Sequence, residues 1–244
     1  MSPIEQITIL YEDENLVIIN KPAGIMVHPD GKTKEKSVSD WVLSRYSQAR
    51  GVGEPTVLST GAVLERHGVV HRIDKETSGV LVLTKNQKTF SFIKKQFQDR
   101  SVEKVYHAIV WGEIKDDRGE IDLPIGRSKS DFRKWSVKNT RGEMRNSKTK
   151  FKVLGRKDGF SLVEVYPETG RTHQIRVHFK AIEHPLVGDS LYAPKKAKEF
   201  GFARLALHAR TIKINTLDGK ILEITAPYPP DFEKAVDRFY NLLS

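Results

Sequence analysis

The chain has 244 residues, of which 38% are hydrophobic and 30% are charged, a composition that excludes a disordered or membrane-embedded protein. Its 41 Lys and Arg residues outnumber its 31 Asp and Glu residues, and the net charge of +10 favours a polyanionic partner such as nucleic acid. Because the sequence has no cysteine, disulfides, thiolate nucleophiles and cysteine-based zinc sites are excluded.

The first part of the chain predicts short strands followed by helices. In order, the pattern predicts strands at residues 7–11 and 16–20, a helix at 38–46, a loop of small and polar residues at 47–68, and a buried strand at 80–84. Phe90, Ile93 and Phe97 then recur at helical spacing, with Lys94 and Lys95 on the other side. We therefore expect an amphipathic helix after the buried strand.

The second part of the chain is richer in strands. The pattern predicts strands at residues 104–111, 151–154, 160–166, 212–214 and 221–224. The Asp-Gly pairs at 158–159 and 218–219 indicate two hairpins. Two helices are expected, one over residues 171–182 capped by Thr172 and one at the end of the chain capped by Asp231. Hairpins with few intervening helices indicate an α+β fold on a mostly antiparallel sheet.

No feature of the sequence divides the chain or directs it to a membrane. It lacks a linker, a repeat, a signal-like N-terminus and any apolar run of the roughly 20 residues that cross a bilayer. The length is close to the roughly 250 residues at which a single core stops growing. We expect one cytoplasmic domain over residues 1–244, with no membrane partner, and a monomer.

The densest cluster of reactive side chains is the segment HRIDKETSG, residues 71–79, directly before the apolar strand. Asp74 is flanked by Arg72 and Lys75, whose charges favour its ionised form. An ionised, well-positioned carboxylate can act as a nucleophile. An aspartate in such a place also commonly forms an ion pair or caps a turn, so local chemistry leaves both roles open.

A second cluster is TGRTHQIRVH, residues 169–178. Arg171 is a candidate for substrate binding, and Arg176 has a guanidinium that can bind a carboxylate or phosphate through two parallel hydrogen bonds. The alternative is an ordinary amphipathic helix with solvated charges. His173 and His178 are five residues apart, not the four that align two ligands on a helix, so no metal is predicted.

A third feature is the basic segment of residues 126–150. It has nine basic residues against two acidic ones, and Phe132 and Trp135 lie among them. Basic side chains follow phosphates and aromatic rings stack on unpaired bases, so we expect RNA binding, with a solvated loop as the alternative. The residues predicted to bind RNA here are Arg127, Arg133 and Lys134. No G-x-x-x-x-G-K-[ST] phosphate loop is present, so nucleotide hydrolysis has no support.

Residues 71–79 resemble the signature H-R-L-D-x-x-T-S-G of RluA-type RNA pseudouridine synthases, with Ile73 in place of the usual Leu. Further blocks resemble the family in the same order: NKPAG at 20–24, EKVYHA at 103–108, GRTHQIRVH at 170–178, HPLVGD at 184–189 and LHA at 207–209. The segment IMVHP at 25–29 looks like the RluD branch. Many relatives carry a small N-terminal RNA-binding domain, and this resemblance covers the catalytic domain alone.

The resemblance implies the family fold, with a cleft across a mixed sheet, and the isomerisation of uridine in RNA without metal or cofactor. It implies that Asp74 starts glycosidic cleavage as nucleophile or base. It also implies that Tyr106 stacks on the uracil and that Arg176 pairs with Asp74. Arg72 is then expected to replace the flipped nucleotide or bind its phosphate, and Leu207 to line the uracil pocket.

The RluD-like block favours ribosomal RNA as the substrate, with transfer RNA as the first alternative. A different class of function is a non-catalytic RNA-binding or ribosome-assembly protein on the same scaffold. A protein that only binds RNA does not need the combination of Asp74, Tyr106 and Arg176, which therefore argues against this class. A metal-dependent nuclease is a third alternative, and the sequence has no carboxylate cluster for it.

Overall fold

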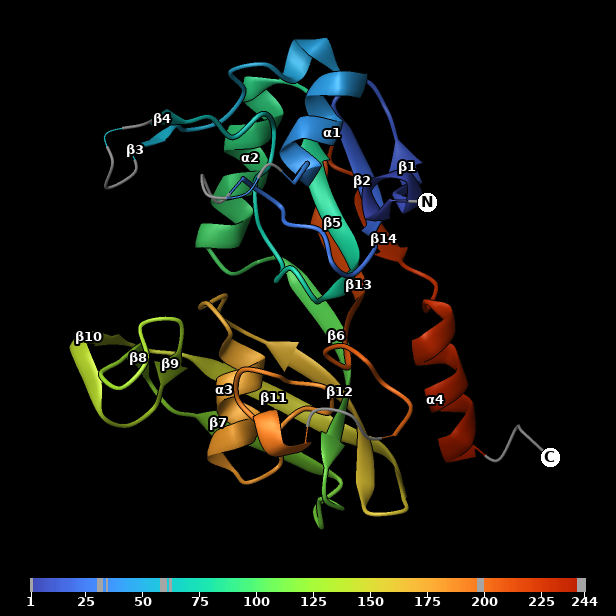
Figure 1. Cartoon of the computed structure of the whole chain (residues 1–244). Coiled ribbons are helices and arrows are strands. Elements are labelled where there is room, and N and C mark those ends of the chain that lie inside the picture. Colours follow the sequence, from blue (N-terminus) through green and yellow to red (C-terminus); the bar gives the residue numbers. More distant parts are fainter. Residues whose placement is uncertain are drawn as a thin grey trace. The chain divides into compact units, whose positions relative to one another are not determined.

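The computed structural model describes residues 2–29, 33, 35–57, 61, 63–196 and 200–240 (Figure 1). The chain divides into two compact units, one formed by Met1–Glu103 and Ala209–Pro227 and the other by Lys104–His208 and Tyr228–Ser244. Each unit has sheet strands and a hydrophobic core of its own. The expectation of one domain over residues 1–244 stays a prediction.

The first unit is built around the strands β2 and β5, whose side chains are almost all buried. Its strand order is β1-β2-β5-β13, with β14 paired to β13, and its helices α1 and α2 begin at the side-chain caps Ser37 and Asn86. Its elements are η1 (Pro3–Gln6), β1 (Thr8–Glu12), β2 (Leu16–Lys21), α1 (Val38–Arg45), η2 (Ser47–Ala49), β3 (Thr56–Val57), β4 (Val63–Leu64), β5 (Ser78–Thr84), α2 (Gln87–Gln98), β13 (Leu207–Asn215) and β14 (Ile221–Thr225).

The second unit has a four-stranded antiparallel arrangement, β6-β12-β11-β7, and a separate three-stranded sheet, β10-β8-β9. Its elements are β6 (Glu103–Trp111), β7 (Arg118–Asp122), β8 (Ile125–Ser128), β9 (Trp135–Ser136), β10 (Thr140–Arg145), β11 (Lys148–Lys157), β12 (Phe160–Pro167), α3 (Gln174–Ala181), η3 (Pro194–Lys196) and α4 (Pro230–Tyr240). The strands β8, β9 and β10 all lie within or at the edge of the basic segment of residues 126–150, which is therefore not simply a loop.

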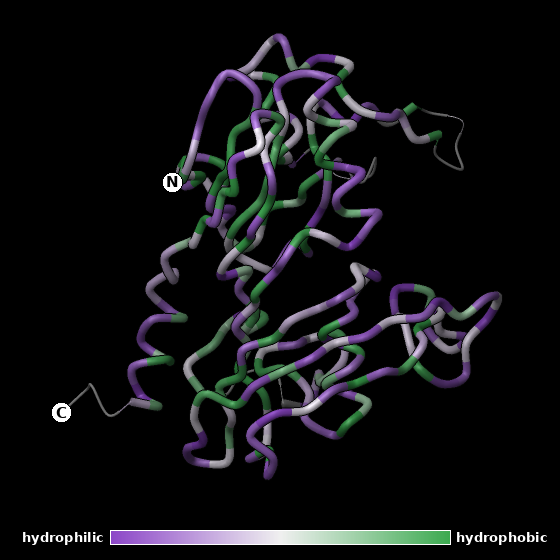
Figure 2. The backbone as a smooth tube through the Cα atoms, turned by 180° about the vertical axis from the view of Figure 1, so that it is seen from behind, coloured by the Kyte–Doolittle hydropathy of each residue, from purple (hydrophilic) through white to green (hydrophobic). Residues whose placement is uncertain are grey.

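The two faces of the β6-β12-β11 sheet are covered by different helices. On one face, Ile175 and Phe179 of α3 pack against alternate strand residues such as Val163. On the other face, Phe232 of α4 belongs to a cluster with Leu162. Green and purple segments alternate along α4 in Figure 2, as expected for an amphipathic helix. None of the described helices is long and apolar enough to span a membrane.

Most predicted elements are confirmed, including the α+β class, the strands and both hairpins. In the first hairpin, Asp158 (φ 54°) and Gly159 (φ 79°) both have left-handed backbone conformations, as the tight turn of an Asp-Gly pair requires. The loop expected at residues 47–68 contains a short helix and two two-residue strands in its described part.

Two predicted helix caps are wrong. Helix α3 begins at Gln174, and its N-cap is His173 in a left-handed conformation (φ 57°), not Thr172. The preceding turn is instead held by the Gln174 side chain, whose Oε1 accepts hydrogen bonds from Thr169 Oγ1 and the Arg171 amide. Helix α4 begins at Pro230, so Asp231 lies in its first turn.

Candidate active site

The segment of residues 71–79 forms a turn and then enters the buried strand β5 in the first unit. Asp74 is half-buried, and its carbonyl accepts a hydrogen bond from the Thr77 amide at 3.1 Å. Arg72 and Lys75 are exposed on either side, whereas Ile73 is buried. Asp74 thus lies in a turn that leads into a rigid strand, while its neighbours Arg72 and Lys75 remain accessible.

Lys21 holds this turn in place through its ammonium group, a role that the sequence did not indicate. Its side chain is fully buried, and Nζ donates hydrogen bonds to the carbonyls of Pro22 (2.8 Å), Ile25 (2.9 Å) and Lys75 (3.1 Å). The Gly24 amide donates to the same Lys75 carbonyl at 2.8 Å. The NKPAG block therefore holds the residue that follows Asp74, and all three ammonium hydrogens have acceptors.

Gly79 explains why the signature ends in glycine. Its φ of +113° lies in a region that L side chains rarely adopt, and a Cβ there would lie 2.1 Å from the carbonyl oxygen of Ala209 on β13. Strand β13 approaches β5 this closely only because no side chain intervenes.

At the start of the signature, His71 Nε2 accepts a hydrogen bond from the Val82 amide at 2.9 Å, and the His71 ring stacks on Phe97.

His28 and Arg66 form a buried contact in the same unit. Arg66 Nη1 lies 3.0 Å from His28 Nε2, and Nη2 donates to Thr56 Oγ1 at 3.0 Å. Burial, followed by the positive charges of Arg66 and Arg72, lowers the pKa of His28 to about 4. The imidazole is therefore neutral at physiological pH and accepts the hydrogen bond from Arg66.

The second unit contains Tyr106, Arg176 and Leu207. Tyr106 on β6 is half-buried and packs against the apolar cluster that includes Leu207 and Ile175. Leu207 is buried at the start of β13, whose first two residues belong to this unit while the rest of the strand belongs to the first unit. The structure thus brings the predicted stacking residue and the predicted pocket leucine to one cluster.

Arg176 on α3 is clamped by Asp189. Arg176 Nε donates to Oδ2 and Nη2 donates to Oδ1, both at 2.8 Å, and the two side chains are buried. The Tyr192 ring lies under the guanidinium, with 4.9 Å from Cζ to the ring centroid. Asp189 also accepts from the Leu191 and Tyr192 amides. In the sequence, Asp189 stands out only as the last residue of the HPLVGD block, and the expected pairing of Arg176 with Asp74 stays a prediction.

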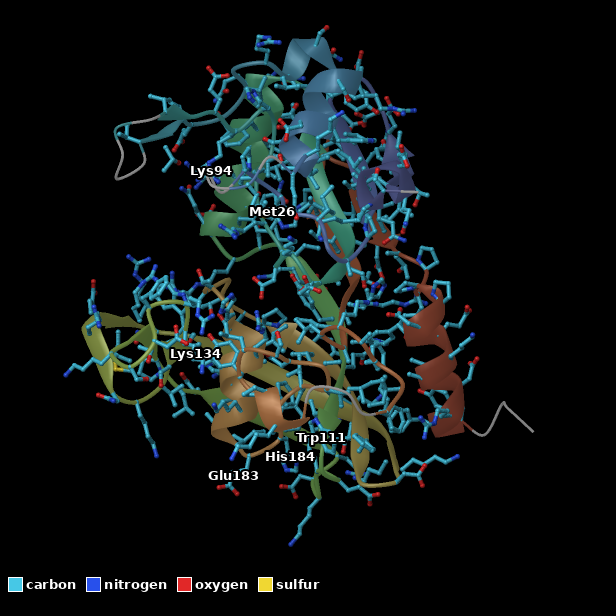
Figure 3. All side chains as sticks on the ribbon, in the orientation of Figure 1. Met26, Lys94, Trp111, Lys134, Glu183 and His184 are labelled. Atoms are coloured by element: carbon cyan, nitrogen blue, oxygen red, sulfur yellow. The ribbon has the colours of Figure 1, made fainter. Side chains whose placement is uncertain are left out.

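The basic residues predicted to bind RNA lie on or beside the three-stranded sheet, where Figure 3 labels Lys134. The Arg127 guanidinium lies over the half-buried Trp135 ring, 5.1 Å from its centroid. Arg133 pairs with Asp131 through two hydrogen bonds, and hydrogen bonds from Arg133 lower the pKa of Asp131 to about 2. Phe132 is 68% exposed, so this ring, unlike that of Trp135, faces solvent.

Arg171 lies in the turn before α3 and not on a strand of the three-stranded sheet. Its Nε donates to the Asn146 carbonyl at 3.2 Å, next to the end of β10. The sequence predicts no metal site. Among the residues that the structure describes, no three His, Cys, Asp or Glu side chains form a group able to hold an ion.

Comparison with known proteins gives a consistent result. Residues 15–181 match the RNA pseudouridylate synthase family. The chain is 39% identical over 237 residues to an uncharacterized RNA pseudouridine synthase of Mycobacterium bovis, covering 96% of this chain and 73% of the relative. It is 33% identical over 235 residues to the ribosomal large subunit pseudouridine synthase D of Borreliella burgdorferi, covering 96% and 69%.

A third relative is the dual-specificity RNA pseudouridine synthase RluA of Vibrio cholerae, 39% identical over 204 residues, with 83% of this chain and 75% of the relative covered. Among solved structures, the human RNA pseudouridylate synthase domain containing 1 matches with a TM-score of 0.75 and 26% identity, covering 96% of this chain and 90% of that one. The human domain containing 4 protein matches with a TM-score of 0.71 and 28% identity, covering 95% and 92%.

Proposed function

Because the chain belongs to the RNA pseudouridine synthase family, and is therefore an isomerase of uridine in RNA, we propose that its substrate is ribosomal RNA. The observation that supports this choice is the similarity, over 96% of the chain, to the ribosomal large subunit enzyme of Borreliella burgdorferi. It agrees with the RluD-like segment of residues 25–29. The dual-specificity relative favours a second RNA class as the alternative, for which transfer RNA is the candidate.

Asp74 is the proposed nucleophile or base. In the reaction, the bond between C1′ of the ribose and N1 of uracil breaks, and a bond between C1′ and C5 forms. The C5 proton is lost and N1 ends protonated, so product and substrate are isomers and no oxidant or reductant is consumed. Support for Asp74 comes from its half-buried position on a turn held by Lys21 and Gly24.

Tyr106 and Leu207 are the proposed contacts of the uracil ring. A half-exposed aromatic ring packed on an apolar cluster can stack on a base without moving. Arg176 is proposed to keep Asp74 ionised and aimed, as the family resemblance implies. The clamp from Asp189 supports this role, because it holds the guanidinium in one orientation before substrate binds.

Arg72 and the basic residues are the proposed contacts of the RNA backbone. Arg72 is exposed two residues before Asp74. Arg127, Arg133 and Lys134 lie on or beside the three-stranded sheet, and Arg171 lies in the turn before α3. Contacts with phosphates offset the few kcal/mol that flipping a base costs. The proposed enzyme is a cytoplasmic monomer that acts without metal or cofactor.

The test is pseudouridine mapping on purified ribosomal RNA and transfer RNA incubated with wild-type protein or Asp74→Asn. We expect a ribosomal site that forms with wild-type protein and is absent with the variant, because the amide is no nucleophile. RNA affinity should be retained by Asp74→Asn, which separates catalysis from binding. Modification of transfer RNA alone would replace the substrate assignment, and near-wild-type turnover by Asp74→Asn would refute the nucleophile.

A further inference from the structure

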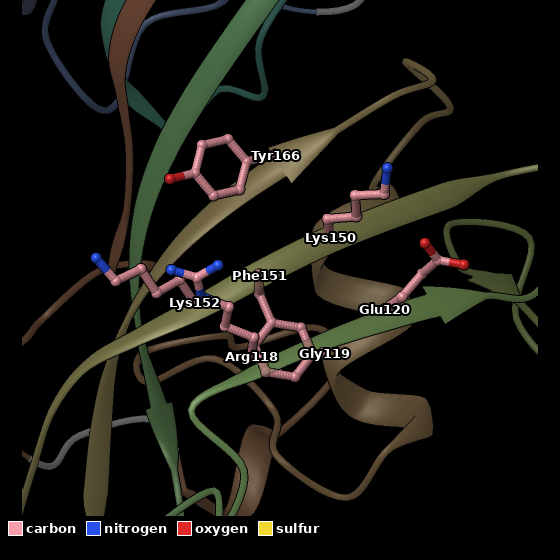
Figure 4. Close-up of a pocket in the computed structure, with 7 residues that line it drawn as sticks. All are labelled: Arg118, Gly119, Glu120, Lys150, Phe151, Lys152 and Tyr166. Carbon is pink, nitrogen blue, oxygen red and sulfur yellow. The ribbon is translucent and has the colours of Figure 1, made fainter.

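A hollow of about 570 Å³ lies on the sheet of the second unit, and none of the residues that line it is a proposed catalytic residue (Figure 4). Its lining comes from three neighbouring strands: Arg118, Gly119 and Glu120 from β7, Lys150, Phe151 and Lys152 from β11, and Tyr166 from β12. Lys150, Lys152 and Tyr166 alternate with residues that pack against α3, so they face away from that helix. The hollow has the size of a small-ligand site.

The charges around the hollow are not balanced. Lys150 pairs with Glu168 at 2.7 Å, and Glu120 pairs with Lys148 at 2.7 Å. Arg118 and Lys152, by contrast, have no ion-pair partner among the residues that the structure describes. These two cations are therefore the charges available to a ligand.

Arg118 and Lys152 also stand directly opposite each other in the register of β7 and β11. Like charges at directly opposed positions of an antiparallel pair destabilise a sheet. An anion bound between them converts this repulsion into two attractions. The arrangement therefore has the chemistry of a phosphate site.

Tyr166 adds an aromatic surface beside the two cations. It lies opposite Lys150 in the register of β12 and β11, and its ring is 37% exposed. Burial, followed by the hydrogen bond that its hydroxyl donates to Glu164, raises the pKa of Tyr166 to about 12. The ring is thus neutral and does not repel a phosphate at physiological pH.

Glu164 is the carboxylate opposite Lys152 on the other side of β11. Its Oε1 accepts from the Tyr166 hydroxyl, and its Oε2 lies 3.3 Å from His107 Nε2. Glu164 thus makes its side-chain contacts with Tyr166 and His107, and it forms no ion pair with Lys152 in the part of the chain that the structure describes. The lysine keeps its charge available for the hollow.

We propose that this hollow binds one nucleotide of the substrate RNA outside the target uridine, with its phosphate between Arg118 and Lys152 and its base on Tyr166. The combination of cations that follow the backbone with an aromatic ring that stacks on a base is how proteins bind unpaired nucleic acid. The inference rests on the proposed function, because it takes the bound RNA to be the substrate.

The experiment measures the affinity of the full-length protein for a ribosomal RNA fragment that it modifies, by fluorescence anisotropy at several salt concentrations. The variants are Arg118→Gln with Lys152→Gln, and Tyr166→Ala. Loss of two phosphate contacts to a single strand should reduce the log–log salt slope by about 1.4. Loss of stacking should weaken binding by at least roughly fivefold, the lower end of the roughly 5- to 150-fold that stacking on one base contributes. The rate at saturating RNA should be unchanged in both, because none of these three residues is among those proposed to act on the target uridine.

Lys213→Gln is the matched control, because it removes one charge from an exposed strand lysine that pairs with Glu103 in the first unit. It should leave affinity within about twofold of wild type. Thermal unfolding of Arg118→Gln alone should be unchanged or shifted upward, because the variant relieves the like-charge pair. A purely structural role for Arg118 predicts the opposite shift.

Wild-type affinity and salt slope in both hollow variants would overturn the inference. The inference would also be overturned if wild-type protein bound uridine monophosphate as tightly as it binds the RNA fragment and the variants lost no RNA affinity. The occupant of the hollow would then be a free nucleotide. Failure of wild-type protein to form pseudouridine in ribosomal RNA refutes the proposed substrate instead. The two failures are thus distinguishable in one set of measurements.

Discussion

Arg176 and Asp189 form a doubly hydrogen-bonded ion pair, with both nitrogen–oxygen distances at 2.8 Å and both side chains buried. The pair joins α3 to the loop after residue 184, and the Tyr192 ring packs against the guanidinium. A buried guanidinium needs such a partner because an uncompensated charge is costly away from water. Asp189 is thus a positioning residue for Arg176.

Replacement of Asp189 by Asn should therefore impair both stability and turnover. Breaking a buried pair by removing one partner costs about 3–5 kcal/mol. We expect a comparable fall in the free energy of urea unfolding, together with a lower kcat at 20 °C, where the variant is still folded. Asp131→Asn breaks the exposed pair with Arg133 and should change neither quantity measurably. Equal stability of the Asp189 variant and wild type would contradict the clamp.

Lys21→Met tests the support beneath the Asp74 turn. The variant keeps the apolar stem but leaves the carbonyls of Pro22 and Ile25 without their ammonium donor, and each buried unsatisfied group costs about 1–3 kcal/mol. We expect lower stability and a fall in kcat with little change in KM for RNA, because the turn and not the RNA surface is disturbed. Lys220→Met, at an exposed turn, is the control. A change in KM alone would argue for a direct RNA contact.

Gly79→Ala should prevent folding or destabilise the protein by more than about 3 kcal/mol, because the new Cβ meets the Ala209 carbonyl at 2.1 Å and φ is unfavourable. Gly159→Ala is the matched control. Its φ of +79° is also positive, but no atom lies within 4 Å of the added Cβ. The free energy of unfolding of that variant should fall by only about 1–2 kcal/mol, which is the cost of the left-handed backbone conformation alone. Soluble expression and thermal unfolding give the comparison, and similar losses in the two variants would contradict the close approach of β13.

Stability should fall as the pH drops from about 6.5 toward about 4. His28 binds a proton with its ordinary pKa of 6.5 in the unfolded chain but only near pH 4 in the folded one, so acid favours unfolding across this window. The lowered pKa of His28 contributes about 3 kcal/mol to the free energy of unfolding. This contribution is fully present above pH 6.5 and is lost below pH 4. Unfolding free energies of wild type and His28→Asn at pH 7.5, 5.5 and 4.5 provide the check. Parallel profiles for the two proteins would exclude His28 as the source.

The basic residues of the three-stranded sheet should control the salt dependence of RNA binding. Replacing Arg127, Arg133 and Lys134 by Gln removes about three phosphate contacts and should reduce the log–log salt slope by about 2 for an unpaired strand. Phe132→Ala should weaken binding without changing the slope, because an exposed ring contributes stacking and not charge. An unchanged slope in the triple variant would remove this sheet from the proposed RNA surface.

The sequence by itself determined much of this picture. Apolar runs and Asp-Gly pairs predicted the strands and hairpins because periodicity and left-handed turn positions are local properties. The motif of residues 71–79 and the blocks around it indicated the family, which the comparisons confirmed. The caps at Thr172 and Asp231 failed because other contacts decide where those helices begin: the Gln174 side chain holds the turn before α3, and Arg204 binds the Asp231 carboxylate.

Only the tertiary structure decided which distant groups support the proposed catalytic residues. Lys21 lies 54 positions before Lys75, and Asp189 lies 13 positions after Arg176, separations that no periodic pattern encodes. Gly79 appeared in the motif, yet its need for a missing side chain depends on β13, more than 120 positions later in the chain. The like-charged pair of Arg118 and Lys152 likewise exists only in the register of two strands. Burial and hydrogen bonding are properties of neighbours in space, and folding alone selects those neighbours.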